Sequence, residues 1–251
     1  MPEASLELRN LRKTYGALAV TDDVSLSVQR GELHAVIGPN GAGKTTLIHQ
    51  VSGLVPPDSG QVLLDGHDVT RLPMHRRVGL GLARTFQITS ILPGFTSIEN
   101  VALAVQARTG SSFRFFGDAA RETGLNEPAM ECLHRVGLDG RAGVPAGSLS
   151  HGEKRQLELA IALATRPKVL LLDEPLAGAG HEDARRVVET LRRLKESLTI
   201  VLVEHDMDAV FSLADRVSVL VYGQVIATDL PERIRAHPEV RAAYLGHEGP
   251  A

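Results

Sequence analysis

The chain has 251 residues, of which 43% are hydrophobic and 23% charged, and its formal net charge is −3. This is the composition of an ordinary globular protein that can bury a substantial core, and the charge gives no reason to expect nucleic acid as the main partner. The one cysteine, Cys132, excludes an internal disulfide framework and fits a reducing cytosol, where we interpret it as a small buried hydrophobe. The sequence has no signal-peptide pattern and no apolar run near the ~20 residues of a membrane span, so we expect any membrane role to be peripheral.

Residues 6–37 predict β structure, because apolar residues alternate along part of this stretch and Gly16 and Gly31 interrupt it. Tyr15 stands just before the first of these glycines. Its ring could stack on an adenine base, or it could be an ordinary surface tyrosine at a strand end. Position alone favours the surface tyrosine.

A glycine-rich loop follows the apolar strand over 33–37 and opens a helix that starts with Lys-Thr-Thr. The segment matches G-x-x-x-x-G-K-[ST] between a strand and a helix, where backbone N–H groups can wrap a polyphosphate and the helix N-terminus adds positive potential. Lys44 can reach the β- and γ-phosphates, and the Thr45 hydroxyl can ligate Mg²⁺. The predicted nucleotide-binding residues of this loop are Gly38, Pro39, Asn40, Gly41, Ala42, Gly43, Lys44, Thr45 and Thr46.

The next stretch predicts a helix that Gly53 ends, a strand over 61–66, a short helix over 73–78 and a strand over 81–87. The last of these strands delivers Gln87 at its end. The Gln87 amide could contact Mg²⁺ and the attacking water, or it could simply hydrogen-bond a loop.

Between Pro93 and Gly147 helical signals replace the strand pattern, with helices expected from Thr96 and over 128–136. We interpret this region as a helical insertion in an α/β core. Phenylalanines cluster over 113–116, and packing beneath a loop is a simpler interpretation of them than docking to a partner.

The remaining chain returns to alternating helices and strands. Ser150 stands at the start of a long predicted helix, and a continuously apolar strand over 169–173 then ends in Asp173 and Glu174. Such continuous apolarity is typical of a parallel strand covered on both faces. Further elements are expected as a helix over 182–198, an apolar strand over 199–203 before His205, a hairpin through Gly223 and a helical tail from Asp229.

Polar residues therefore follow several apolar strands: the phosphate loop, Gln87, the Asp173–Glu174 pair and His205. Ligands bind at the carboxyl ends of parallel strands in open α/β sheets, so we expect these residues around one Mg–nucleotide. Because neighbouring strand residues point apart, Asp173 could hold Mg²⁺ while Glu174 deprotonates water near the γ-phosphate. The competing interpretation of the acidic pair is helix capping or ion pairing. For His205 alone, a core or surface histidine is the default, and its place after a buried strand is what favours the site.

These motifs together resemble the ATP-binding subunit of ABC transporters, and the resemblance covers nearly the whole chain. It is carried by residues 38–46, Gln87, 149–153, 170–175 and His205. It implies that Tyr15 stacks on adenine, that Gln87 forms the Q-loop, that Glu174 is the general base and that His205 senses the γ-phosphate. It also implies a signature motif, Ser150, Gly152 and Glu153, which contacts the γ-phosphate bound by a second subunit.

The fold class implied is α/β. It combines a phosphate-loop NTPase core of RecA type, a mostly parallel sheet, an N-terminal antiparallel β subdomain and a helical subdomain insertion. We expect residues 1–90 and 147–229 to form the nucleotide-binding core, 91–146 the helical subdomain and 230–251 a C-terminal tail.

Within the family, the runs over 83–87, 96–100, 204–207 and 243–246 look like the branched-chain amino-acid uptake type. That type is similar to importers of urea, amides and aromatic acids, so the solute stays open. The sequence departs from the usual family pattern at His151 in the signature, at Glu153 where Gln is common, and at Gly180–His181 where an Asn-Pro or Leu-Asp pair is usual. The last departure puts the contacts of the D-loop across a dimer in doubt.

The resemblance implies a cytoplasmic ATPase, peripheral on the inner face of the cell membrane, that binds ATP and Mg²⁺. Its expected partners are transmembrane permease subunits, a second ATP-binding subunit and, indirectly, a periplasmic or extracellular solute-binding protein, with no nucleic acid. The alternatives are a soluble ATPase of the same family acting on nucleic acid or ribosomes, a lipopolysaccharide-export ATPase and a phosphate-loop small-molecule kinase. Against the first, the chain lacks long coiled-coil insertions and basic tracts. The Arg-Thr-Phe run over 84–86 argues against the second, and a kinase would leave the signature and His205 without a role.

Overall fold

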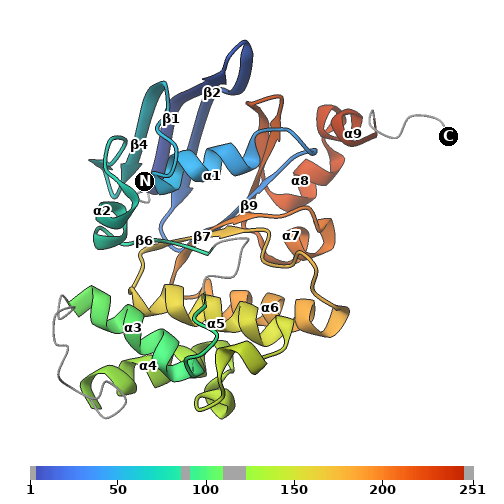
Figure 1. The fold of residues 1–251 in the computed structure, drawn as a ribbon. Helices are drawn as coiled ribbons and strands as arrows, with labels where there is room; N and C mark the ends of the chain where they lie inside the picture. Colours follow the sequence, from blue (N-terminus) through green and yellow to red (C-terminus); the bar gives the residue numbers. More distant parts are fainter. Residues whose placement is uncertain (1–3, 86–90, 110–122, 246–251) are drawn as a thin grey trace.

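The computed structural model describes residues 4–85, 91–109 and 123–245 (Figure 1). Gln87 and the phenylalanine cluster over 113–116 lie outside the described residues, so their predicted roles stay predictions. Within the described part, two sheets and the helices around them form the α/β architecture expected from the sequence.

An antiparallel sheet forms the N-terminal part of the fold. Its strands are β1 (Ala4–Tyr15), β2 (Leu18–Gln29), β4 (Ser59–Leu64) and β5 (His67–Asp68), in the order β2-β1-β4-β5. One face is buried through alternating residues, among them Leu6, Leu8, Val24 and Leu26, as the period of two predicts. The predicted N-terminal antiparallel sheet is thereby confirmed.

A second sheet of six strands carries the predicted site, in the order β10-β9-β3-β8-β7-β6. Its strands are β3 (Leu33–Ile37), β6 (Leu82–Arg84), β7 (Val169–Asp173), β8 (Thr199–Val203), β9 (Arg216–Val221) and β10 (Gln224–Asp229). The pairings from β9 through β6 are parallel, and β10 alone in this sheet runs antiparallel, to β9. The carboxyl ends of β3, β8, β7 and β6 therefore lie side by side along one edge.

Alternate residues of the central strands pack on opposite faces of this sheet. Val169 and Leu171 join the apolar cluster of α1 (Lys44–Ser52) and the antiparallel sheet. Leu170 and Leu172 join the cluster of α5 (His151–Ala164) and α6 (His181–Leu194). Figure 1 shows α1 above the sheet and α5 below it. The continuous apolarity of β7 thus has the cause that the sequence predicted, because both of its faces are covered.

The insertion is helical, as expected. It contains α3 (Ser97–Thr109), α4 (Thr123–Val136) and the 3₁₀ turns η2 (Asp139–Arg141) and η3 (Ala146–Ser148). Both α3 and α4 pack on α5. The described part of α4 begins at Thr123, ahead of the predicted start at Pro128, which lies inside the helix. The subdomain limits 91–146 stay a prediction.

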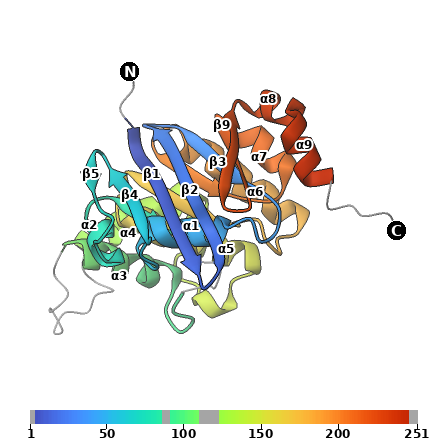
Figure 2. The same cartoon turned by 90° about the horizontal axis from the view of Figure 1, so that it is seen from above.

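Short helices complete the fold. They are α2 (Met74–Gly79), α7 (Met207–Leu213), α8 (Pro231–Ala236) and α9 (Pro238–Leu245). Figure 2 shows α7, α8 and α9 gathered beside β9, where Val210, Ile234 and Val240 pack on that strand. Helix α6 ends at Leu194 rather than at the predicted Leu198, because the chain turns there before β8. None of the described helices is long and apolar enough to span a bilayer.

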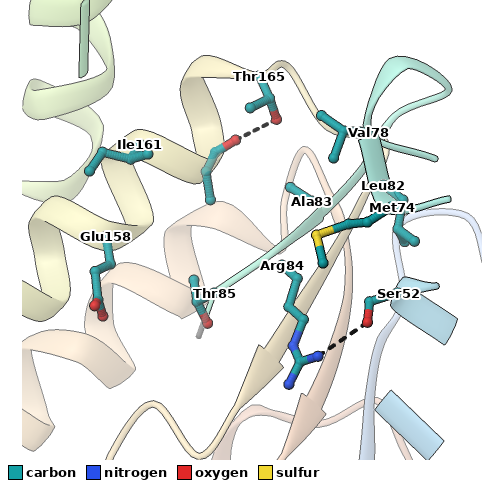
Figure 3. A pocket seen from close by; sticks show the side chains of 11 residues that line it. Ser52, Met74, Val78, Leu82, Ala83, Arg84, Thr85, Glu158, Ile161 and Thr165 are labelled. Carbon is teal, nitrogen blue, oxygen red and sulfur yellow. Dashed lines mark hydrogen bonds between the residues drawn. The ribbon is translucent and has the colours of Figure 1, made fainter. Parts of the chain in front are cut away.

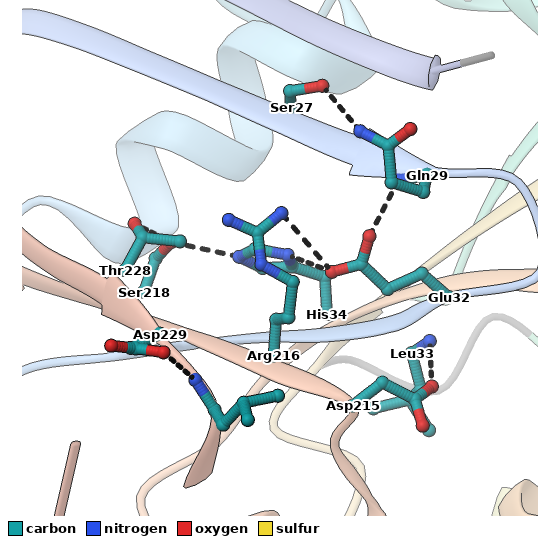
Figure 4. A network of polar contacts seen from close by, with 11 residues as sticks. Ser27, Gln29, Glu32, Leu33, His34, Asp215, Arg216, Ser218, Thr228 and Asp229 are labelled. Carbon is teal, nitrogen blue, oxygen red and sulfur yellow. Dashed lines mark hydrogen bonds and ion pairs between the residues drawn. The ribbon is translucent and has the colours of Figure 1, made fainter. Parts of the chain in front are cut away.

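A buried polar network fixes how β3 sits in this sheet (Figure 4). The His34 ring lies 2.8 Å from Glu32 Oε1 through Nδ1 and 2.9 Å from Ser218 Oγ through Nε2. Ser218 Oγ in turn lies 2.7 Å from Thr228 Oγ1 on β10. His34 and Ser218 are both 0% exposed, so this acid–imidazole–hydroxyl chain has no access for a substrate. It satisfies buried polar groups and links β3, β9 and β10.

Candidate active site

The phosphate loop connects β3 to α1 and is shaped by close backbone approach. A Cβ atom at Gly38 would lie 2.1 Å from the Leu220 carbonyl oxygen, and one at Gly43 would lie 2.2 Å from that of Val20. Gly43 also has φ 103°, in the left-handed region that favours glycine. A larger residue at either position would clash, so both positions require glycine. With glycine there, the loop can lie in close contact with β9 and the start of β2.

Lys44 folds over this loop from the first turn of α1. Its Nζ donates to the carbonyl oxygens of Gly38 at 2.7 Å and Pro39 at 3.1 Å, and the residue is 7% exposed. Burial lowers the pKa of Lys44, and the charges of Glu174 and Asp173 partly offset that effect. The sheet thus brings the predicted cation and both predicted carboxylates together. Thr45 is exposed beside Lys44.

Asp173, at the end of β7, is 1% exposed and forms an ion pair with Arg84 of β6. Its Oδ2 accepts from Arg84 Nη2 at 2.9 Å, and Arg84 Nη1 donates to Ser52 Oγ at 3.1 Å (Figure 3). Its Oδ1 is buried and has no hydrogen-bond partner among the described residues. A carboxylate oxygen left without a donor suits a hard cation such as Mg²⁺, which takes few protein ligands beside phosphate and water. The donor set of Asp173 and Thr45 therefore fits this metal.

Arg84 was not predicted as a site residue. The sequence showed it only inside the run that precedes Gln87. An arginine in a predicted strand, three residues before Gln87, was the available signal, but its partner lies 89 residues away. Only the pairing of β6 with β7 brings the two residues into contact.

Glu174 follows Asp173 in a strained backbone conformation. Its φ is +50°, which is uncommon for a residue with a side chain and typical of functional turns. Its N–H donates to the Val203 carbonyl oxygen at 2.9 Å, which fixes the turn to the end of β8. The side chain is half-buried and is held at the same sheet edge as Lys44.

His205 follows β8 and projects from the same edge, with its side chain 63% exposed. The residue before it, Glu204, is 0% exposed and was missed as a site residue. Glu204 Oε1 accepts from Leu176 N at 2.7 Å and Oε2 from His205 N at 3.1 Å. Burial raises the pKa of Glu204 although these N–H groups oppose the shift. Glu204 therefore ties the turn that carries Glu174 to the turn that carries His205.

Tyr15 lies at the end of β1, and its β1–β2 hairpin reaches the phosphate loop through Val20. The residue is 52% exposed, and Lys13 Nζ lies 5.6 Å from the centroid of its ring. An exposed ring on the hairpin beside the phosphate loop is compatible with stacking on a base. The interpretation as a plain surface tyrosine stays equally compatible.

The signature residues lie elsewhere, at the N-terminus of α5. Ser150 caps this helix: its Oγ accepts from Glu153 N at 3.2 Å, and Glu153 Oε2 accepts from Ser150 N at 2.8 Å, which is a capping box. A Cβ atom at Gly152 would lie 2.3 Å from Asp183 Oδ1. Because α5 and α1 pack on opposite faces of the sheet, the fold does not merge this motif with the phosphate loop of the same chain.

A phosphate loop, a buried strand-end carboxylate with one oxygen that no described residue contacts by a hydrogen bond, and a strained acidic neighbour at one sheet edge define a phosphate-loop ATPase. Comparisons with known proteins narrow this class. A model of the ABC transporter family matches residues 21–177, and one of branched-chain amino acid ATP-binding cassette transporters matches residues 224–250. The chain belongs to the ABC transporter family of ATP-binding proteins.

Named relatives and solved structures agree with this family. The chain is 36% identical to the high-affinity branched-chain amino acid transport ATP-binding protein BraF of Pseudomonas aeruginosa, covering 98% of this chain and 99% of that protein. It is 35% identical to LivG of Escherichia coli, with the same coverage. The ADP conformation of the ATP-binding cassette MJ1267 matches with a TM-score of 0.85 and 30% identity, covering 97% of this chain and 99% of that one. A post-hydrolysis dimer of the cassette MJ0796, bound to ADP and Pi, matches with a TM-score of 0.75 and 26% identity, covering 90% of this chain and 98% of that one.

Proposed function

We propose that this chain is the ATP-hydrolysing subunit of an importer for branched-chain amino acids or related small solutes. The observation that carries the proposal is the joint placement of Lys44, Asp173 and Glu174 at one sheet edge, in a chain similar along its length to BraF and LivG. The subunit would act in the cytoplasm, on the inner face of the cell membrane. Transport would also require permease subunits and a solute-binding protein outside the membrane.

The chain's own residues divide the chemistry among them. Lys44, turning from the carbonyls of its loop, would bind the β- and γ-phosphates. Asp173 Oδ1 and the Thr45 hydroxyl would hold Mg²⁺, which neutralises phosphate charge when bound. Glu174 would orient a water molecule and accept its proton, and His205, exposed at the next strand end, would contact the γ-phosphate. Gln87 would complete the site at the metal, and Tyr15 would stack on the adenine base.

The signature requires a second subunit. The N-terminus of α5, with Ser150 and Gly152, would contact the γ-phosphate bound by a partner, because a helix N-terminus favours anions. The position of α5 on the opposite sheet face from α1 supports sharing between two chains. Two copies, or this chain and a similar partner, would thus enclose two ATP molecules.

An apolar groove between α2 and α5 is the proposed permease site (Figure 3). It is lined by residues of α2, β6 and α5, which include Met74, Val78, Leu82, Ala83 and Ile161. β6, which forms one wall, ends three residues before Gln87 in the sequence. A permease helix seated here would therefore lie against the strand that carries Arg84, the partner of the metal carboxylate.

The variant Glu174→Gln tests the proposal. It keeps the size of the side chain but cannot accept the proton, so hydrolysis should fall at least ~100-fold while ATP binding persists. On Mg–ATP the variant should form a stable dimer, alone or with a companion subunit, in sedimentation experiments. Near-normal turnover would show that another residue is the general base. A chain that stays monomeric at saturating Mg–ATP with every companion tried would contradict the shared site.

A second measurement separates the rival functions. Proteoliposomes that contain the permease should stimulate ATP hydrolysis by the wild-type chain. DNA should leave the rate unchanged, and so should a small-molecule phosphoryl acceptor. Stimulation by either of the last two would favour a nucleic-acid ATPase or a kinase.

A further inference from the structure

The signature end of α5 carries negative charge where the proposed function requires it to receive a triphosphate. Glu153 stands at the third position of the helix, and its carboxylate accepts a hydrogen bond from the Ser150 N–H in the capping box. Asp183 packs directly against Gly152. Two carboxylates thus lie at a helix N-terminus that, under the proposed function, must accept a further anion. Their negative charges would repel the phosphates.

One cation in the described part of the chain is paired with Glu153. Arg141 Nε lies 2.9 Å from Glu153 Oε1, while Glu153 Oε2 accepts from Ser150 N. The Arg141 side chain is 46% exposed and that of Glu153 is 20% exposed. The nearby Arg186 donates to Glu182 Oε1 at 2.6 Å, and its charge acts more weakly on Asp183 and Glu153. The Ser150 N–H and the Arg141 guanidinium both hold the pKa of Glu153 below its ordinary value, so the carboxylate is charged.

We infer that Arg141 neutralises Glu153 so that the signature end of α5 can accept the triphosphate of a partner subunit. This inference rests on the proposed function. Arg141 lies in η2, within the helical insertion, so the insertion supplies a charge that the acidic signature itself lacks. It acts through Glu153 and is a positioning residue, not a catalytic one.

The effect should be small in a single chain and large in the closed dimer. An ion pair as exposed as this one contributes little to folding. When two chains close, the pair loses water and faces the phosphates, and an uncompensated carboxylate there would oppose association. Loss of this ion pair should therefore lower the affinity of the dimer and leave the stability of the single chain nearly unchanged.

The test is a double-mutant cycle in the hydrolysis-blocked Glu174→Gln parent, read as dimer dissociation constant on Mg–ATP by sedimentation. Arg141→Met should weaken the dimer at least ~10-fold, with the melting temperature of the chain unchanged within ~2 °C. Glu153→Gln keeps the capping box and removes the charge, so it should restore the affinity of the Arg141→Met variant. Arg135→Met, which removes an equal charge from α4, is the matched control and should leave the dimer unchanged.

The outcomes are distinct. Failure of the Glu174→Gln parent to dimerise with any companion would overturn the proposed function and this inference together. A parent dimer that Arg141→Met leaves intact would overturn the inference alone. So would a loss that persists after Glu153→Gln, because a purely structural role of Arg141 would not depend on the charge of Glu153.

Discussion

The carboxyl edge of the six-stranded sheet and the N-terminal end of α5 carry the two parts of the proposed chemistry, and they are built differently. At the sheet edge, Lys44 and Asp173 are nearly inaccessible and have partners within the chain. At the end of α5, Ser150 and His151 are exposed, and the hydrogen bonds of Ser150 are local to the helix. Under the proposed function, the sheet edge would bind nucleotide within one chain, whereas the signature would act on the nucleotide of a second subunit.

Substitutions in the two regions should therefore have different consequences. Changes at the sheet edge should alter properties of the isolated chain, because the interactions lost there are internal. Changes at the signature should alter association and leave the isolated chain almost unaffected. Single substitutions with matched controls can test this contrast.

The largest effect is expected for Lys44→Ala. It removes the buried cation that would contact the phosphates, so ATP affinity of the isolated chain should fall at least ~100-fold. Isothermal titration at protein concentrations that keep the chain monomeric measures this. Lys154→Ala, which removes the same charge beside the signature, is the control and should bind ATP normally. An equal loss in both variants would erase the contrast between the two regions.

Arg77→Met should destabilise the scaffold of the phosphate loop. The buried guanidinium donates to the carbonyl oxygens of Gln50, Val51, Leu72 and Thr70 at 2.7–2.9 Å, and so holds the C-terminal end of α1. Burial lowers the pKa of Arg77 to about 10, which still leaves it charged at neutral pH. The loss of these bonds should cost about 3 kcal/mol in free energy of unfolding.

Urea denaturation measures the effect of Arg77→Met. The matched control is Arg76→Met. Arg76 lies beside Arg77 in α2 but is exposed, so its loss should change the free energy of unfolding by less than ~0.5 kcal/mol. Similar unfolding midpoints for the two variants would mean that the carbonyls at the end of α1 find other donors. The scaffold of the phosphate loop would then depend on buried interactions within the chain no more than the N-terminal end of α5 does.

Gly152→Ala should have the smallest effect, confined to association. The new Cβ would meet the Asp183 carboxylate and force it to move, which should weaken the Mg–ATP dimer of the Glu174→Gln parent about 10-fold. ATP binding by the isolated chain should stay within about twofold. Gly143→Ala is the control, because its Cβ would enter open space. A loss of nucleotide binding in Gly152→Ala would show that the signature serves its own chain.

The sequence predicted the sheet edge well because its residues sit at fixed places relative to local patterns. Lys44, Asp173, Glu174 and His205 each follow an apolar strand, and parallel strands bring their ends to one edge. The predicted start of α4 and the predicted end of α6 differed from the observed ones. Helix ends depend on turns and tertiary contacts that propensity alone does not encode.

The supporting residues could not be predicted in the same way. Arg84, Arg77 and Glu204 act on partners far along the chain, or on backbone atoms that the sequence does not distinguish. An arginine or glutamate beside a strand is ordinarily a solvent-exposed residue. Only the burial of these three side chains marks them as structural supports of the site.

The order of residues along the chain was enough to predict the class of fold and a set of candidate ATP-contacting residues, because glycine geometry, strand periodicity and charged strand ends are local properties. Packing between distant elements set which oxygen of Asp173 has no hydrogen bond from the described residues, what holds the phosphate-loop helix, and how the charge of Glu153 is balanced. Those outcomes depend on distances between side chains on different elements, and ion pairing and burial are set by such distances rather than by order along the chain.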